Sequence, residues 1–539
     1  MVVAAPVLGF YVKKIFISAA AMLAFAATAH ADELSDVQAQ AKQMSKRLAD
    51  LEKRQKALEA ERPVAINPVD AMAADLPYKA AVRAKPSEND DICVKGICVY
   101  GNFDMGLQYE QHGAPFGALS STPNNDALIQ KNGLGSYFGV AANQLSGSFI
   151  GLRGSQEIAD NLYAVFNLQT IFNPASGQNA NGQASVAQNN GLTTNLALQN
   201  AYNDSSKSGQ LFNNAAYFGF SSPTYGTFTL GRQSALTSDL VVNYDPISNA
   251  SSWSLLAGQG ANGGGGDTEN RIFDNSYEYR LNIGPVRLAG EVQIRNGGNS
   301  GTGNAFEGNV GFDYQGLSVD FVGGKIYDAV SAAPLSVAQL QTAAVNGVAV
   351  GNGQIAATIS DNTVFQVAAR YNIGPWKLFG GYEHIDFANP NNPLNPGAFD
   401  SGGFIIAAPT NNNFTADKVL QTAWVGVRYA ITPAVDIAGA YYHEWQNSFV
   451  IGNGSNPTGT CRTVASAGCS GTEDAVALVV DWRFARHVDL YAGVLWTQVS
   501  NGLANGFLAA ATNNAGVTNP NGPNKASTYD PGIGLRYQF

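Results

Sequence analysis

The chain has 539 residues, of which 45% are hydrophobic and only 13% charged, against roughly 25% charged residues in an ordinary globular protein. The net charge of −10 and the low charge density argue against a nucleic-acid-binding protein and against a disordered polyelectrolyte. The mean hydropathy is −0.09 and the longest apolar run, residues 15–29, is too short for a transmembrane helix, which excludes a helical membrane protein. A transmembrane β-barrel has this composition, because only every second strand residue faces lipid.

Residues 1–31 are predicted to be a secretory signal peptide. Lys13 and Lys14 precede the apolar run, and the Ala-His-Ala tripeptide at 29–31 forms a small-residue cleavage site. The long apolar stretch ahead of Lys13 favours translation from Val12 through an alternative start codon. Cleavage would remove the two lysines and no acidic residue, which takes the net charge from −10 to −12.

Residues 32–62 are predicted to form a periplasmic coiled coil, because apolar positions alternate at spacings of three and four. The seam positions are Leu34, Val37, Ala41, Met44, Leu48, Leu51, Gln55 and Leu58. Four heptads are too few to fold alone, so we expect self-assembly to bury the seam. The alternative is a single amphipathic helix on the protein's own surface. Pro63 ends the helix, and residues 63–96 are predicted to be a linker that finishes in a small hairpin.

The four cysteines form two close pairs. Cys93 and Cys98 flank a Lys-Gly pair that suits a two-residue turn, and Cys461 and Cys469 lie together in one predicted loop. Secretion favours a disulfide within each pair. The alternative, a four-cysteine metal site, would have to join opposite sides of the membrane.

From Ile97 onward the hydrophobic period is two, which indicates β-strands. In the first strand Phe103, Met105 and Leu107 share one face, opposite a polar face. The sixteen predicted strands are 97–110, 146–158, 161–173, 213–222, 225–233, 271–283, 285–296, 304–315, 317–329, 361–373, 376–388, 417–431, 434–447, 471–485, 488–500 and 525–539. The predicted fold is therefore an all-β, antiparallel transmembrane barrel over residues 97–539.

The connections between these strands alternate between tight turns and long loops. The long loops, rich in Asn, Gly and Ser, are 111–145, 174–212, 234–270, 297–303, 330–360, 389–416, 448–470 and 501–524. Short turns on one side and long loops on the other are typical of an outer-membrane barrel. An even number of strands leaves no open edge in lipid, and about sixteen strands enclose a water-filled lumen.

Several segments resemble the general porin family of Gram-negative outer membranes, which consists of trimeric sixteen-stranded barrels. The similar segments, in family order, are SFIGLRGSQE (148–157), NLYAVF (161–166), NNAAYFGF (213–220), YGTFTLGR (225–232), DNSYEY (274–279) and GLRYQF (534–539). The resemblance covers about 97–539. It implies a homotrimer in contact with outer-membrane lipid and lipopolysaccharide, whose terminal Phe539 is read by the barrel-assembly machinery.

The resemblance also implies a passive diffusion channel for small hydrophilic solutes and ions. Loop 234–270 would fold into the lumen, and basic wall residues would face acidic loop residues across the constriction. The implied wall residues are Arg153, Arg232 and Arg271, and the implied loop residues are Asp239, Asp245, Asp267 and Glu269. The alternative role for each of these arginines is to anchor the loop by a salt bridge.

Two of these arginines depart from strict strand alternation. Arg232 has the parity of Leu230 and would face lipid unless the strand ends or bends there. Arg271 has the parity of Tyr277 and Tyr279, so it needs a bulge or a place in the loop.

No catalytic, metal or cofactor motif stands in a supporting context. The five histidines lack ligand spacing, and the G-x-G-x-x-G match at 258–263 neither follows a strand nor opens a helix. Two alternatives to a general diffusion channel stay open: a substrate-specific channel, and a tether in which the coiled coil contacts peptidoglycan. An enzyme and a nucleic-acid partner are not expected.

Overall fold

The computed structural model describes most of one compact unit, Met72–Phe539. The described residues are 92–94, 96–111, 136–179, 211–257, 272–294, 304–334, 355–391, 417–447, 470–501 and 525–539, with short pieces at 399–401, 404–406, 410–411, 450–451 and 459–460. The predicted signal peptide, coiled coil, linker and Cys461–Cys469 pair lie outside these residues. In the described part of the chain, no helix is both long and apolar enough to cross a membrane.

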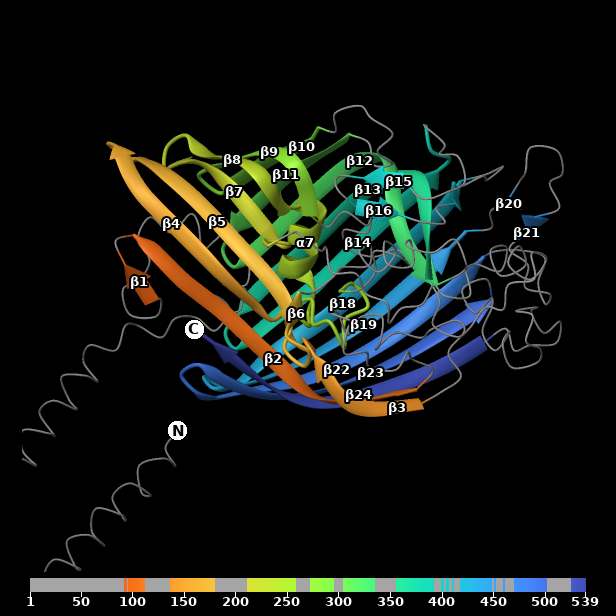
Figure 1. The fold of residues 1–539 in the computed structure, drawn as a ribbon. Helices are drawn as coiled ribbons and strands as arrows, with labels where there is room; N and C mark the ends of the chain where they lie inside the picture. Colours follow the sequence, from red (N-terminus) through yellow and green to blue (C-terminus); the bar gives the residue numbers. More distant parts are fainter. Residues whose placement is uncertain are drawn as a thin grey trace, which may run out of the picture. The chain divides into compact units, whose positions relative to one another are not determined.

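In the part of the chain that the structure describes, sixteen antiparallel strands form the wall of a closed barrel (Figure 1), as predicted, and four further short strands join the same sheet. The strands are β2 (Ile97–Gln111), β4 (Phe149–Ala159), β5 (Leu162–Asn173), β7 (Ala215–Ser222), β8 (Gly226–Ser234), β9 (Ile272–Ile283), β10 (Val286–Gln293), β11 (Ala305–Tyr314), β12 (Leu317–Pro334), β13 (Ile355–Ile373), β14 (Trp376–Ala388), β18 (Lys418–Thr432), β19 (Val435–Gln446), β22 (Gly471–Ala485), β23 (Val488–Asn501) and β24 (Lys525–Gln538). The last strand pairs with the first, and Phe539 exchanges two backbone hydrogen bonds with Gly101. The closed ring leaves no sheet edge in lipid.

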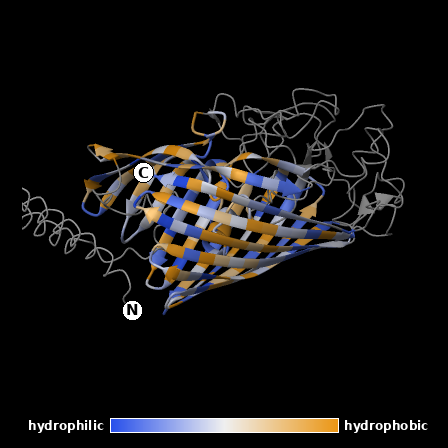
Figure 2. Ribbon diagram, turned by 90° about the horizontal axis from the view of Figure 1, so that it is seen from below, coloured by the Kyte–Doolittle hydropathy of each residue, from blue (hydrophilic) through white to orange (hydrophobic). Residues whose placement is uncertain are grey.

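Inward and outward residues alternate along each strand, so apolar and polar bands alternate over the wall (Figure 2). On β2, Phe103 and Met105 are 39% and 44% exposed on the outside, whereas Asp104 is fully buried on the inside. A soluble sandwich would place the charged face outward. The apolar outer face and the polar inner face are those of a wall between lipid and a polar lumen.

Tight turns join the strands at one end of the barrel. At the β11–β12 turn, Gln315 and Gly316 both have positive φ, +47° and +86°, the geometry of a type I′ hairpin. Outward aromatic residues gather near this end, and the rings of Trp376 and Tyr429 lie 4.2 Å apart between centroids. Such residues suit the membrane–water interface.

The prediction places one strand, 146–158, next to the first strand of the barrel. In the structure two strands share this place. Strand β3 (Ser136–Ala142) lies in the predicted loop 111–145 and pairs with the long-loop half of β2, while β4 pairs with the other half. Further short strands within predicted loops are β6 (Gln178–Asn179), β15 (Phe399–Ser401), β16 (Phe404–Ile406), β17 (Thr410–Asn411), β20 (Val450–Ile451) and β21 (Gly459–Thr460).

A small hairpin precedes the barrel. Strand β1 (Ile92–Val94) pairs with the start of β2, and the register sets Cys93 directly opposite Cys98. The two cysteines form the predicted disulfide. The single described helix in the barrel unit, α7 (Leu236–Tyr244), follows β8 and is central to the candidate site.

Candidate pore constriction

The chain leaves β8 through a bulge that turns it into the barrel. Gly231 has a φ of +134°, and the register against β9 shifts between Gly231 and Gln233, as in a β-bulge. The bulge buries Arg232, whose Nε donates to the carbonyl oxygen of Asn213 at 2.7 Å and whose guanidinium pairs with Asp274. Strict alternation would have placed this arginine on the lipid face.

Helix α7 follows at once and lies inside the ring of strands (Figure 1). Glu307 of β11 holds its first turn, because the carboxylate accepts hydrogen bonds from the backbone N–H (3.0 Å) and the hydroxyl (2.9 Å) of Thr237. Asp239 pairs with Arg280 of β9, which also binds Glu278 at 2.6 Å. Carboxylates are favoured at a helix N-terminus by the helix dipole, so these contacts fix the start of the helix on the wall.

The last turn of α7 rests on β10, β12 and β13. The hydroxyl of Tyr244 donates to the carboxylate of Asp320 at 2.6 Å. Arg287 donates to the Tyr244 hydroxyl oxygen at 3.1 Å and to the Asp320 carboxylate at 3.0 Å. Arg370 donates to the carbonyl oxygen of Asn243 at 3.3 Å. A cation at the carbonyl end of a helix is also favoured by the dipole.

Beyond α7 the segment crosses to β18 and β19. The buried carboxylate of Asp245 accepts hydrogen bonds from the hydroxyl of Tyr442 (2.5 Å) and from the backbone N–H of Asn249 (2.6 Å). Burial raises the pKa of Asp245 above its usual value, and these hydrogen bonds offset part of the rise. Arg428 donates to the carbonyl oxygen of Pro246 at 2.9 Å and to the hydroxyl oxygen of Ser248 at 2.7 Å.

Trp253 anchors the far end of the crossing between β23 and β24. Its side chain is fully buried, its Nε1 donates to the carbonyl oxygen of Asp530 at 3.2 Å, and its ring lies 5.7 Å from that of Tyr491. Gly493 and Gly532 leave room for the indole, because a Cβ on Gly493 would come within 2.6 Å of it. The described loop segment, residues 235–257, therefore spans the lumen.

Besides the loop segment 235–257, residues 143–148 between β3 and β4 also lie inside the barrel. Asp104 of β2 accepts hydrogen bonds from two backbone N–H groups of this segment, at 3.1 and 2.8 Å. The carbonyl oxygen of Gln144 accepts one from the backbone N–H of Ser252 at 2.9 Å. Wall and loop thus meet inside the barrel.

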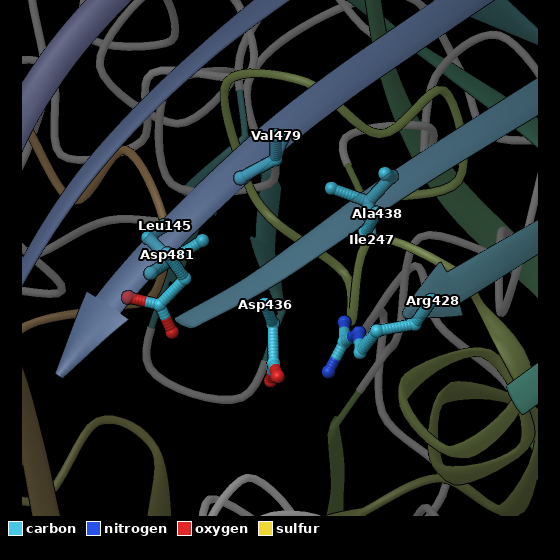
Figure 3. A pocket seen from close by; sticks show the side chains of 7 residues that line it. All are labelled: Leu145, Ile247, Arg428, Asp436, Ala438, Val479 and Asp481. Atoms are coloured by element: carbon cyan, nitrogen blue, oxygen red, sulfur yellow. The ribbon is translucent and has the colours of Figure 1, made fainter. Parts of the chain in front are cut away.

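A small pocket lies between these inward segments and strands β18, β19 and β22 (Figure 3). Its lining residues are Leu145, Ile247, Ala438 and Val479 on the apolar side and Arg428, Asp436 and Asp481 on the charged side. The two aspartates are directly opposite in the β19–β22 register, and Arg483 lies 3.0 and 3.7 Å from their carboxylates. Arg428 extends its guanidinium toward Asp436. Closely spaced charges of both signs therefore line the lumen near the short turns.

The predicted site residues fall into three groups. Arg153 faces inward with its guanidinium 4.6 Å from the ring centroid of Tyr100, while Arg232 is buried at the β8 bulge. The loop acids Asp239 and Asp245 bind a β9 arginine and a β19 tyrosine. Outside the described residues lie Arg271, Asp267 and Glu269.

The prediction omitted four arginines that hold the loop or its anchoring groups: Arg280, Arg287, Arg370 and Arg428. Their signal in the sequence is parity, since each occupies the polar face of a strand. The pairing of distant strands, which brings them to one segment, is not visible in that pattern.

The family model for Gram-negative porins matches residues 18–502 of the chain. An outer membrane porin protein of Bordetella pertussis is 25% identical over 151 residues, which span 28% of this chain and only 31% of that relative's length.

Three solved structures are similar to the chain. The anion-selective porin from Comamonas acidovorans has 17% identity and a TM-score of 0.49, over 82% of this chain and 99% of that one. OmpT of Vibrio cholerae has 13% identity and a TM-score of 0.48, over 83% and 99%. The outer membrane channel DcaP of Acinetobacter baumannii has 12% identity and a TM-score of 0.44, over 84% and 100%. Because the family model covers most of its length, the chain belongs to the Gram-negative porin family, and its barrel is an outer-membrane barrel.

Proposed function

We propose that the barrel is a water-filled channel for the passive diffusion of small hydrophilic solutes and ions. The observation that carries this proposal is the segment 235–257, which spans the lumen of a closed barrel and is bonded to the wall along its length. A segment held in this way sets the width of the path, and charges on it and on the wall filter ions.

Liposome swelling tests this function directly. Liposomes that contain the purified protein should swell in small sugars and fail to swell in large oligosaccharides, because the loop sets a size limit. Swelling that does not depend on solute size would contradict a constriction, and impermeability to every solute would contradict a diffusion channel.

We propose that ion selectivity depends on the acids of the loop and the basic residues of the wall. The buried pair of Asp239 and Arg280 supports this, because it places opposite charges on the loop and on the wall. Arg153 supplies a second inward cation. Arg271, Asp267 and Glu269 are proposed to contribute to the same field, which would orient dipolar solutes as they pass.

We propose that the protein is a homotrimer surrounded by outer-membrane lipid and lipopolysaccharide, as the family resemblance implies. The proposed assembly signal is the aromatic carboxyl-terminal strand that ends at Phe539, which the barrel-assembly machinery would read. Native mass spectrometry in detergent should give the mass of three mature chains. A monomer under conditions that preserve the fold would contradict the trimer.

We propose that residues 32–62 tie the subunits together as a periplasmic coiled coil. Deleting this segment should weaken the trimer and leave the conductance of each barrel unchanged. The competing tether role predicts envelope defects with an intact trimer, through lost contact with peptidoglycan. A substrate-specific channel would instead give currents that saturate with one solute.

A further inference from the structure

Lys377 of β14 lies on the inward face of the wall, near the short-turn end. Its neighbours along the strand, Trp376 and Leu378, are 45% and 46% exposed on the outside. Because successive strand residues point to opposite faces, the ammonium group of Lys377 points toward the lumen.

Two more cations lie on the same inward face of the adjacent strands. The β14–β18 register sets Lys377 directly opposite Arg428. The β13–β14 register sets it opposite Asn372, and Arg370 stands two residues further along that strand. Side chains that face each other across antiparallel strands have Cβ atoms about 5 Å apart, so one small ligand can touch groups from both strands.

The acids on the adjoining strands bind Arg483 and Arg287, and Asp436 also faces the guanidinium of Arg428. Asp436 of β19 lies 3.0 Å from Arg483, and Asp320 of β12 lies 3.0 Å from Arg287. Within the described ranges, no hydrogen bond or ion pair joins Lys377 to a carboxylate. Like charges directly opposite each other destabilise a sheet, so a bound anion would relieve the repulsion at this position.

The two arginines are held in place before any ligand arrives. Arg428 donates to the carbonyl oxygen of Pro246 and to the hydroxyl of Ser248, and Arg370 donates to the carbonyl oxygen of Asn243. Figure 3 shows Arg428 reaching inward from β18 to the edge of the loop. Groups that are already positioned lose less entropy when they bind a ligand.

We propose that Lys377, flanked by Arg370 and Arg428, binds a compact oxyanion in the lumen, on the short-turn side of the loop. Inorganic phosphate and small carboxylates share the required chemistry, because both present several charged oxygens to cationic donors. The proposal rests on the proposed channel function and adds a binding step below the constriction. An oxyanion that has passed the loop would pause there and impede the chloride ions that follow it.

The test is inhibition of the potassium chloride current through single channels of the full mature protein in planar bilayers, with phosphate or succinate added. Both probes are used, and the one that half-inhibits at the lower concentration identifies the preferred oxyanion. Lys377→Gln should raise the half-inhibiting concentration at least about tenfold, the loss expected for one charge-assisted hydrogen bond. Lys377→Arg, which keeps the charge, should restore most of the inhibition.

The matched control is Lys418→Gln, which removes one lysine at the long-loop end of β18. It should leave oxyanion inhibition unchanged. Equal inhibition of Lys377→Gln and the unaltered protein, or no inhibition of either, would overturn the site while the chloride current persists. Absence of any potassium chloride current would overturn the channel function itself, which separates the two failures.

Discussion

At the scale of single residues, inward acids and arginines hold the loop against the wall. Thr237 is bound by Glu307, and Asp239 by Arg280, so both contacts fall within the first turn of α7. These groups are largely buried, so the loss of one of these bonds leaves a buried polar or charged group with fewer partners. The ion pair is therefore a sensitive point of the constriction.

Asp239→Asn should loosen the start of α7 and shift ion selectivity toward anions. Arg280 keeps Glu278 as a partner in this variant, so the loss is that of one hydrogen bond to a charged group, about 1.5–3 kcal/mol, which is enough to loosen the helix locally. We expect a noisier single-channel current and a reversal potential moved toward the chloride equilibrium potential in a salt gradient.

The control for this variant is Asp160→Asn, which removes the same charge from an exposed position in the β4–β5 turn. It should leave current noise unchanged. Equal noise and equal reversal potentials in both variants would show that the ion pair has no part in the constriction.

At the scale of elements, the strands could be predicted from the sequence and the fold of the loop could not. All sixteen barrel strands could be predicted from the sequence, because lipid outside and water inside impose a hydrophobic period of two on every strand. The loop shows no such period, since its partners come from strands throughout the barrel. Trp253, for example, is fixed by groups on β23 and β24.

Because the loop lacks the period of the strands, only part of the site could be predicted. Asp239 and Asp245 were predicted as loop acids from the family resemblance, but their partners, Arg280 and Tyr442, were not. Strand β3 was missed because it is short and lies beside a Gly-rich stretch without strong alternation.

Gly493→Ala should partly undock the far end of the loop. The added methyl group would come within 2.6 Å of the Trp253 indole, and overpacking of this kind typically costs about 1–3 kcal/mol. We expect slow switching between conductance levels in single-channel records.

Gly290→Ala is the matched control, because a Cβ on this β10 glycine would meet no atom within 4 Å. Its records should show one stable level. Stable records from Gly493→Ala as well would mean that docking of Trp253 does not fix the loop.

At the scale of the whole molecule, the weak charge follows from the barrel and its loops. Lipid-facing strand residues dilute the charge, and the buried acids and arginines of the strands lie on the inner face. The low charge that distinguishes this chain from a soluble protein thus reflects the outer face of the barrel together with weakly charged long loops. In the proposed channel, the charges on the inner face are the ones that act on solutes.

The barrel is proposed to conduct ions passively through a lumen narrowed by one folded loop. Single-channel recording of the full mature protein in planar bilayers tests it most directly. We predict stepwise insertions with an ohmic conductance that rises in proportion to potassium chloride concentration, because ions move through water without a saturable chloride site at the constriction. No conductance steps, or a conductance that saturates at low salt, would contradict a diffusion channel.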